Sequence, residues 1–272
     1  MVQIPFKAWD NSTAFSKMKT EEYSNLPVYI TGTTDDWNGS MSIVLNDVQA
    51  VSDVSLDVFL PVRYDANSYF VGLYNLVKTY CSEKAVAILD KAIFKNEEVA
   101  DRFKIEFAAT SHHDNCKTGL LAHTYKVFST VVNIATTFPN LVPTQDLKDL
   151  LYIGAVVHDL GKIKEMKLGI YQPCSVVTHR YLGIEMLPKE DIIKAYGESG
   201  WLQLVSILLQ HHGEYDDKCR TVLAYVVHQA DIMDSRLTLL SQNLENPLSG
   251  DAGAFVKVDD CRLQIVGVSN EG

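Results

Sequence analysis

Apolar residues between positions 67 and 240 recur mostly at intervals of three and four, the spacing that places them on one face of an α-helix. The same stretch is interrupted by proline and glycine at short intervals, which divides it into separate helices. We expect these helices to pack around one core as an all-helical domain. The segments with the clearest helical spacing are 69–80, 85–93, 120–134, 147–157, 201–211 and 221–240.

The segment 147–157 is apolar on nearly all sides, which predicts a buried helix rather than a surface one. Thr144 is placed to cap its start, and Gly161 is expected to end it by adopting the left-handed conformation. The helix leads directly into His158 and Asp159, followed by Lys162. A carboxylate buried at that point needs a cation, several hydrogen bonds or a metal ion.

Strand-like alternation of apolar and polar residues is confined to the two ends of the chain. Residues 26–37 and 40–51 predict a hairpin, with Asp35, Asp36, Asn38 and Gly39 as turn formers. Residues 254–268 predict a second hairpin, which we expect to turn near Asp259 and Asp260 and which could pair with the N-terminal strands. The predicted fold is therefore mainly α, with a small β-rich lobe at 1–56, a helical domain at 57–245 and a C-terminal hairpin at 246–272.

Length and composition fit a globular chain with a full core, because 47% of its 272 residues are hydrophobic. We expect no membrane segment, since no apolar run approaches the length of a span and the start lacks a basic segment followed by an apolar one. The cysteines are odd in number, scattered and without a CxxC pair, which favours reduced thiols and a cytoplasmic location. They are Cys81, Cys116, Cys174, Cys219 and Cys261.

The charge balance is acidic: 34 Asp and Glu against 24 Lys and Arg give a net charge of -10. Proteins that follow a long nucleic-acid backbone usually present a basic surface, because released counterions supply much of the affinity. Bound metal ions would offset part of this acidity, and a short oligonucleotide or a nucleotide needs few phosphate contacts. The charge therefore favours a short or small substrate.

Histidine and aspartate residues occur near the predicted helix ends or on their apolar faces, where several could meet. Each alone has a structural explanation, such as a core histidine bonded to a backbone carbonyl. Together, neutral imidazoles and carboxylates suit divalent Mn, Fe, Zn or Mg, and a carboxylate can bridge two ions. The candidate metal ligands are His123, His158, Asp159, His179, His211, His212 and Asp231, with the choice between His211 and His212 open.

The ordered series of a histidine, the His158–Asp159 pair, further histidines and Asp231 resembles the HD-domain superfamily of metal-dependent phosphohydrolases. Its most specific local segment is HDLGK at 158–162. Residues 57–240 resemble the YhaM-type 3′→5′ exoribonucleases within that superfamily. The similar segments are DVFLPVRYDAN, SHHDNCKTGLLAHT, VVHDLGK, LLQHHGEYD and VVHQADIMDSR.

The resemblance implies two metal ions that share Asp159. His123, His158 and Asp231 would complete one site, and His179 with His211 or His212 would complete the other. It also implies an N-terminal OB fold, for which the region before residue 57 is too short and too poor in basic residues. Tyr23, Tyr29 and Trp37 could stack on bases there, or pack locally. Homo-oligomers are a further implication.

Three residues near the predicted ligands are candidates for catalytic roles. Lys162 could neutralise a phosphate oxygen as charge builds in the transition state, or could be a solvated lysine at a helix end. His112 and His113 resemble a histidine pair of the YhaM-type family; they could contact substrate phosphate or transfer protons, or lie in an exposed loop. Residues 165–178 are expected to form an irregular loop close to the site.

The favoured function is a metal-dependent phosphodiester hydrolase, a 3′→5′ exonuclease on short RNA or single-stranded DNA that uses metal-activated water. A nucleotide phosphohydrolase or a cyclic (di)nucleotide phosphodiesterase is the main alternative, because specificity in such sites lies in loops. A regulatory protein that binds nucleotides without turnover is a third possibility. The complete set of ligands argues against it.

Overall fold

The computed structural model describes residues 4–21, 23, 26–37, 40–52, 54, 56–110, 114–213, 217–245, 247–250 and 253–266. The chain divides into two compact units, Met1–Pro61 and Val62–Gly272. None of the helices in this described part is long and apolar enough to cross a membrane.

The first unit is a three-stranded sheet with one helix. Strands β2 (Val28–Trp37) and β3 (Ser40–Ala50) form the predicted antiparallel hairpin, and β1 (Phe6–Ala8) adds in parallel to β3. Asp35 and Asp36 are paired within β2 rather than in the turn, so that part of the prediction was wrong. Helix α1 (Thr13–Thr20) packs on β3, and a small core forms around Ala14. A 3₁₀ turn at Leu56–Phe59 follows β3.

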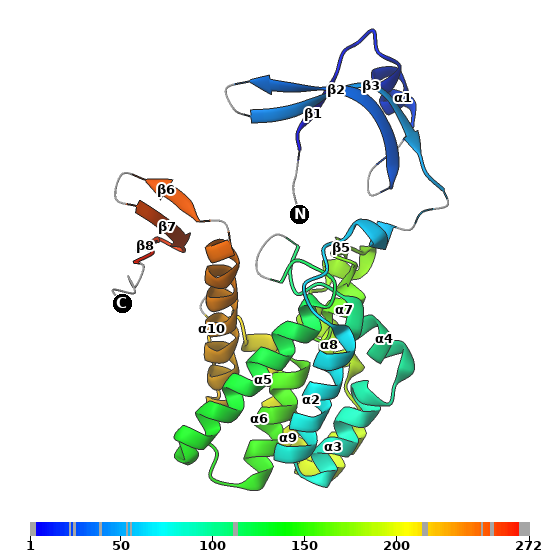
Figure 1. The fold of residues 1–272 in the computed structure, drawn as a ribbon. Helices are drawn as coiled ribbons and strands as arrows, with labels where there is room; N and C mark the ends of the chain where they lie inside the picture. The colour runs from blue at the N-terminus through cyan, green and yellow to red at the C-terminus, as the bar shows by residue number, and fades with distance from the viewer. Residues whose placement is uncertain are drawn as a thin grey trace. The chain divides into compact units, whose positions relative to one another are not determined.

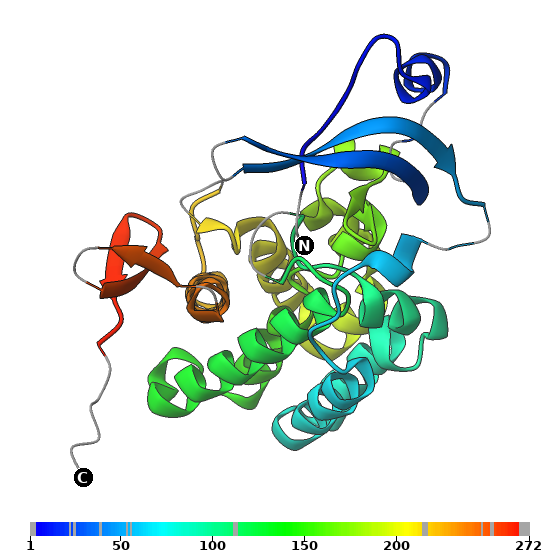
Figure 2. The same cartoon turned by 45° about the horizontal axis from the view of Figure 1, so that its top comes forward.

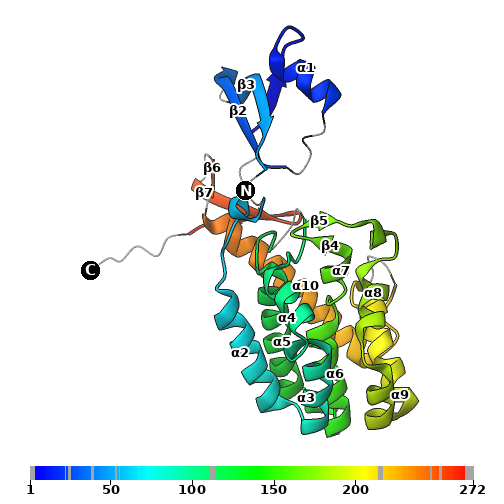
Figure 3. The same cartoon turned by 90° about the vertical axis from the view of Figure 1, so that its right-hand side faces the viewer.

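The second unit is the expected helical domain (Figure 1). Helices α2, α5 and α6 run side by side, and α9 and α10 pack against α5 or α6 (Figure 3). The shorter α3 and α4 are separated by a π-helical turn at Asp90–Phe94, where the sequence predicted continuous helix. The helices are α2 (Ala66–Tyr80), α3 (Glu83–Leu89), α4 (Glu97–Ile105), α5 (Gly119–Thr137), α6 (Gln145–Val157), α7 (Lys162–Glu165), α8 (His179–Met186), α9 (Lys189–Gln210) and α10 (Val222–Glu245).

Helix α6 is the most deeply buried element, as its apolar sequence predicts. Its N-terminus is capped by Thr144, whose hydroxyl accepts a hydrogen bond from the Leu147 amide at 3.3 Å. Gly154 lies against α9, because a Cβ at this position would approach the Ile207 side chain to 2.4 Å. This close packing fixes the position of the His158–Asp159 pair at the end of α6.

Gly161 differs from its predicted role. Its φ of -62° is right-handed, so it does not end α6 by a left-handed turn. A Cβ there would instead lie 1.9 Å from the His179 carbonyl oxygen and 2.5 Å from the Gly183 amide. Glycine at 161 is therefore required for the close approach of α8, which carries His179. Gly213, just past α9, does adopt the left-handed conformation, with a φ of 59°.

Two smaller β elements complete the unit. The segment 165–178, predicted to be irregular, forms a short hairpin of β4 (Met166–Lys167) and β5 (Ile170–Tyr171) and a 3₁₀ turn at Pro173–Val176. The C-terminal hairpin is present as predicted, but β7 (Gly253–Val258) and β8 (Cys261–Gln264) pair with β6 (Leu248–Gly250) in a sheet of their own. This sheet packs against α10 through β7 (Figure 2).

Candidate metal centre

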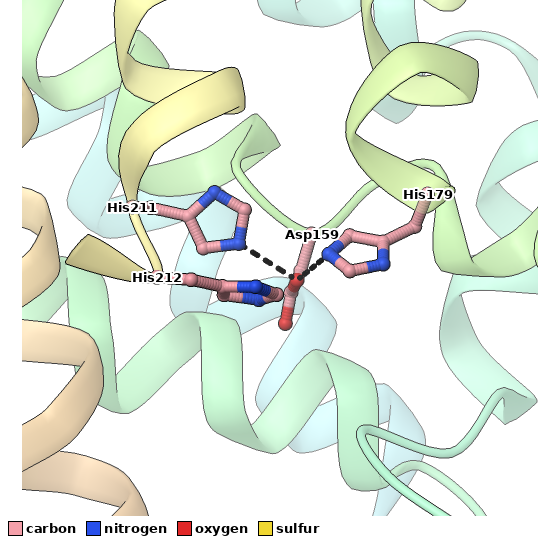
Figure 4. A group of neighbouring side chains, drawn as sticks. All are labelled: Asp159, His179, His211 and His212. Atoms are coloured by element: carbon pink, nitrogen blue, oxygen red, sulfur yellow. Dashed lines mark ion pairs between the residues drawn. The ribbon is translucent and has the colours of Figure 1, made fainter. Parts of the chain in front are cut away.

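The predicted ligands come from five places in the helical unit. His123 lies on α5, His158 and Asp159 follow α6, and His179 is the first residue of α8. The remaining three, His211, His212 and Asp231, lie just after α9 and on α10. Figure 4 shows three imidazole rings gathered around the Asp159 carboxylate.

One set of ligand atoms surrounds His123. Its Nε2 atom lies 3.2 Å from His158 Nε2, 3.2 Å from Asp231 Oδ1 and 3.6 Å from Asp159 Oδ2. His158 Nε2 is also 3.6 Å from Asp159 Oδ2. Two atoms bound at right angles to one ion, at about 2.1 Å each, lie about 3 Å apart. The spacing of these four side chains therefore suits a shared ion.

The second set faces the other oxygen of the same carboxylate. Asp159 Oδ1 lies 3.4 Å from His179 Nε2 and 3.5 Å from His211 Nε2. The His212 ring stands 4.3 Å from the His211 ring between centroids, and its ligand atoms fall within the same cluster. Both histidines left open by the sequence therefore lie at the site. The two oxygens of Asp159 point toward two different ligand sets, the geometry of a bridging carboxylate.

Hydrogen bonds at the far nitrogen of His158, His211 and His179 fix which nitrogen of each ring faces the centre. His158 Nδ1 donates to the Ala155 carbonyl at 2.9 Å, and His211 Nδ1 donates to the Leu208 carbonyl at 3.0 Å. Carbonyls only accept, so these Nδ1 atoms carry the proton and Nε2 keeps its lone pair. His179 Nδ1 contacts the Glu165 carboxylate at 3.1 Å and reinforces the same orientation.

Three buried atoms at the centre lack a hydrogen-bond partner in the described part of the chain: Asp159 Oδ1, His179 Nε2 and His211 Nε2. Asp149, another buried carboxylate, differs: it accepts from the Ser82 amide and hydroxyl, Gln145 and Tyr196. Buried polar atoms are normally satisfied, so the three at the centre call for a ligand. Imidazole nitrogen and carboxylate oxygen are the donors that divalent Mn, Fe and Zn accept.

The protonation states suit a cation. Burial alone would raise the pKa of the Asp159 carboxyl, but Lys162 and the surrounding histidines hold it well below its usual range. Burial lowers the pKa of His211 to about 3 and also lowers the pKa of His158 and His212. Burial would likewise lower the pKa of His123, but bonds to Asp231 and Asp234 raise it to about 10. Metal binding would therefore release a proton from His123.

Lys162 is placed beside the bridging carboxylate. Its Nζ donates to Asp159 Oδ2 at 2.6 Å and to the Ala108 carbonyl at 2.7 Å, and its side chain is 15% exposed. Lys162 is therefore a largely buried ion-pair partner of the candidate ligand Asp159. His112 and His113, also candidates from the sequence, lie outside the described residues.

Sequence reasoning missed the residues behind the ligands. Asp234 accepts from His123 Nδ1 at 2.7 Å, Glu165 holds His179, and His228 contacts the His211 carbonyl at 2.6 Å. One signal was present: Asp234 follows Asp231 by three residues, which places both on one face of a helix.

A third cluster of possible ligands consists of Asp114, His123 and Asp234. A lysine side chain already lies beside its two carboxylates. Lys126 Nζ lies 2.8 Å from Asp114 and 3.2 Å from Asp234. The two carboxylates are therefore compensated by the lysine, and we interpret this cluster as a support for His123 rather than a separate metal site.

Comparison with known proteins places the centre in a family context. Residues 120–236 match the family model of the HD domain, and all seven predicted ligands lie within this range. The chain is 25% identical over 263 residues to 3′-5′ exoribonuclease YhaM of Bacillus subtilis (strain 168), covering 91% of this chain and 79% of the relative. The identity to the protein of the same name from Shouchella clausii is 25% over 255 residues, covering 86% and 75%.

A higher identity occurs over a shorter range. The 3′-5′ exoribonuclease YhaM of Bacillus licheniformis is 30% identical over 153 residues, which are 53% of this chain and 47% of the relative. No solved structure gives a significant match. Residues 120–236 therefore match an HD domain, and the chain is similar to YhaM exoribonucleases over most of its length; together these similarities indicate a metal-dependent hydrolase.

Proposed function

Starting from the HD domain in residues 120–236, we propose that the chain hydrolyses phosphodiester bonds at the 3′ end of short single-stranded RNA or DNA. The observation that carries the proposal is the position of Asp159, whose two oxygens face two sets of metal ligands. A pair of ions joined by one carboxylate suits displacement at phosphorus, because the attacking and leaving oxygens can both be stabilised.

In this proposal the ligand sets hold two divalent ions of Mn, Fe, Mg or Zn. His123, His158 and Asp231 would bind one ion, His179, His211 and His212 the other, and Asp159 both. When bound, the ions supply Lewis-acid activation of water and charge neutralisation at the phosphoryl group. The chain's own contribution is to hold neutral imidazoles with Nε2 facing inward, in a site that excludes most water.

Among the described residues, Lys162 is best placed to meet developing negative charge. Its ammonium lies 2.6 Å from Asp159 Oδ2, so it borders the same space as the ligands. Once ions compensate Asp159, the ammonium can turn toward a phosphate oxygen of the substrate. We therefore assign Lys162 to binding of substrate phosphate, where a preorganised cation has its largest effect on rate.

Two observations support an exonuclease on short strands. The similarity to the YhaM proteins extends well beyond the HD domain, to 91% of the chain. The net charge of -10 favours substrates that need few phosphate contacts. The proposal includes a cytoplasmic location, which the five free cysteines favour.

The alternative is hydrolysis of a free nucleotide or a cyclic (di)nucleotide, and the acidity of the first unit favours it. Residues 1–61 contain eight Asp and Glu against three Lys and no Arg, a net charge of -5. Such a unit has little electrostatic attraction for a nucleic-acid strand. A role in binding without turnover is less well supported, because every predicted ligand that the structure describes lies at the centre.

The test is hydrolysis of a 5′-labelled single-stranded oligonucleotide with added manganese, with Asp159→Asn as the inactive control. A ladder of products shortened one nucleotide at a time from the 3′ end supports the proposal. An intact oligonucleotide, together with hydrolysis of a mononucleotide or a cyclic dinucleotide, would establish the alternative. Internal cuts without a ladder would contradict the exonuclease assignment.

A further inference from the structure

A groove with a volume of about 680 Å³ runs along α10 in the helical unit. Helix α10 lines it with residues from successive turns, beginning at Met233 and Asp234 and ending at Glu245. Lys126 of α5 lies on one wall, and Arg63, from the segment just before α2, lies at the outer end. The volume is in the range of pockets that hold a nucleotide-sized ligand.

The inner end of this groove lies behind His123, and none of the seven candidate ligands is among the described residues that line it. Asp234, which lines the groove, bonds to His123 Nδ1 at 2.7 Å, on the opposite side of the ring from the ligand nitrogen. The outer end is eleven residues further along α10, about 16 Å at 1.5 Å per residue. The groove therefore runs from the support of His123 to Glu245, along the helix that also carries Asp231.

An exchangeable cation lies at the outer end. Arg63 Nη1 donates to both carboxylate oxygens of Glu245, at 2.8 and 2.9 Å, and the two side chains are 38% and 53% exposed. Ion pairs this exposed contribute little to stability, so the guanidinium can leave Glu245 at small cost. The planar guanidinium fork matches a phosphate group as well as a carboxylate.

Lys126, the cation at the inner end, cannot change partner as easily as Arg63. Lys126 Nζ pairs with Asp114 and Asp234, whose side chains are 0% and 5% exposed. Leaving either carboxylate unpaired in the interior is costly, which keeps Lys126 in place. Of the two cations among the described residues that line the groove, Arg63 is therefore the one that can change partner.

The walls also present apolar surface and hydroxyl groups. Met233 and Leu237 line the groove and are 50% and 54% exposed, which is high for side chains of this type. Apolar surface of this kind suits the faces of sugars and bases, whereas the hydroxyl of Thr130 can bond to sugar or phosphate oxygen.

We infer that this groove holds the nucleotides on the 5′ side of the bond being cut, with Arg63 binding a backbone phosphate and Glu245 competing for the same guanidinium. The inference rests on the proposed function, because it requires a single-stranded substrate whose 3′ end reaches the metal centre. It assigns opposite effects to the two members of one ion pair, an outcome that a purely structural pair does not produce.

The experiment compares Arg63→Gln and Glu245→Gln in the full-length, manganese-loaded protein, using a short 5′-labelled single-stranded oligonucleotide. KM and kcat are measured over a series of salt concentrations. Arg63→Gln should raise KM roughly fivefold to tenfold. It should also reduce the slope of log KM against log salt concentration by about one, the value for one lost phosphate contact. Glu245→Gln should lower KM roughly twofold to fivefold, because the competing carboxylate is gone.

Two controls separate the groove from the rest of the molecule. Lys91→Gln and Asp191→Asn break a different exposed ion pair and should leave KM unchanged. A small chromogenic phosphodiester, which does not reach the groove, should be hydrolysed equally by all variants. Loss of that activity in Arg63→Gln would show that the metal centre is disturbed and would overturn the assignment.

The remaining outcomes distinguish this inference from the proposed function. If the wild type shortens the oligonucleotide but both groove variants keep its KM and salt dependence, the groove is not the path of the strand and the exonuclease proposal stands. Equal increases of KM in both variants would also overturn the inference. If the wild type leaves every oligonucleotide intact, the proposed function and the inference fall together.

Discussion

His123 Nδ1 lies 2.7 Å from Asp234 Oδ2, on the opposite side of the ring from the Nε2 atom that faces the other candidate ligands. The second oxygen of Asp234 accepts from the Thr238 hydroxyl at 3.1 Å and lies 3.2 Å from Lys126 Nζ. Carboxylates in this position fix the tautomer and orientation of a ligating histidine. The candidate metal centre therefore has a supporting residue, Asp234, that lies behind His123 and does not face the other candidate ligands.

Asp234→Asn should weaken metal binding about 10-fold to 100-fold. The amide can turn its NH₂ toward His123 Nδ1, which would move the ring proton to Nε2 and remove the lone pair that binds the ion. The measurement is titration with Co²⁺, followed by its visible spectrum, which reports coordination geometry directly. Thr238→Val should have a smaller effect in the same direction, and Thr238→Ser should restore binding. Unchanged Co²⁺ affinity in Asp234→Asn would show that Asp234 does not support the centre.

Lys162→Ala should lower kcat about 10²-fold while the bound metal content stays near that of the wild type. The metal-free variant should unfold at a lower temperature than metal-free wild type, because Asp159 loses its 2.6 Å partner in the interior. Added manganese should narrow this gap, since ions then compensate the carboxylate. Thermal unfolding with and without manganese measures the difference in unfolding temperature and how far manganese narrows it. A variant without bound metal would instead make Lys162 part of the support of the centre.

Gly161→Ala should destabilise the fold by about 3 kcal/mol or more, because the added methyl meets backbone atoms of α8 at 1.9 and 2.5 Å. The matched control is Gly72→Ala on α2, where the nearest atom is a Tyr125 ring carbon at 3.2 Å. That change should stay within about 1 kcal/mol, since alanine favours the helix. Denaturant unfolding of both variants tests the packing, and similar small effects would argue against the close approach of α8 to Gly161.

Removal of residues 1–61 should impair cleavage of longer oligonucleotides more than hydrolysis of a small chromogenic phosphodiester. The reason is that the described ligands and their supports all lie in the unit Val62–Gly272. Steady-state kinetics on both substrates, with circular dichroism to check folding, measures the difference. An equal loss on both substrates would mean that the first unit acts on stability instead.

The sequence predicted best where apolar periodicity and chemistry coincide. The helix before His158, its cap at Thr144 and the C-terminal hairpin were placed correctly, because each depends on local pattern. The role of Gly161 was predicted wrongly. Glycine is needed there because α8 packs closely against it, and the local sequence does not show which segment will pack at that position. Asp35 and Asp36 were misread for a similar reason: strand pairing with β3 overrode their turn preference.

At the centre, the candidate ligands could be predicted from their residue types. The residues that hold these ligands in place could not. Asp234, Lys126 and Glu165 are ordinary charged residues in the sequence, and their roles arise only when α5, α7, α8 and α10 meet. The choice between His211 and His212 could not be made from spacing, since adjacent residues after a helix point in different directions. The structure brings both to Asp159.

The central claim is that Asp159 joins two metal ions, and elemental analysis of metal-loaded protein tests it most directly. Wild type and Asp159→Asn are compared after dialysis against manganese and removal of loosely bound ions. We expect close to two ions per chain in the wild type and a loss of both ions and turnover in the variant. Wild-type metal content and activity in Asp159→Asn would contradict the claim.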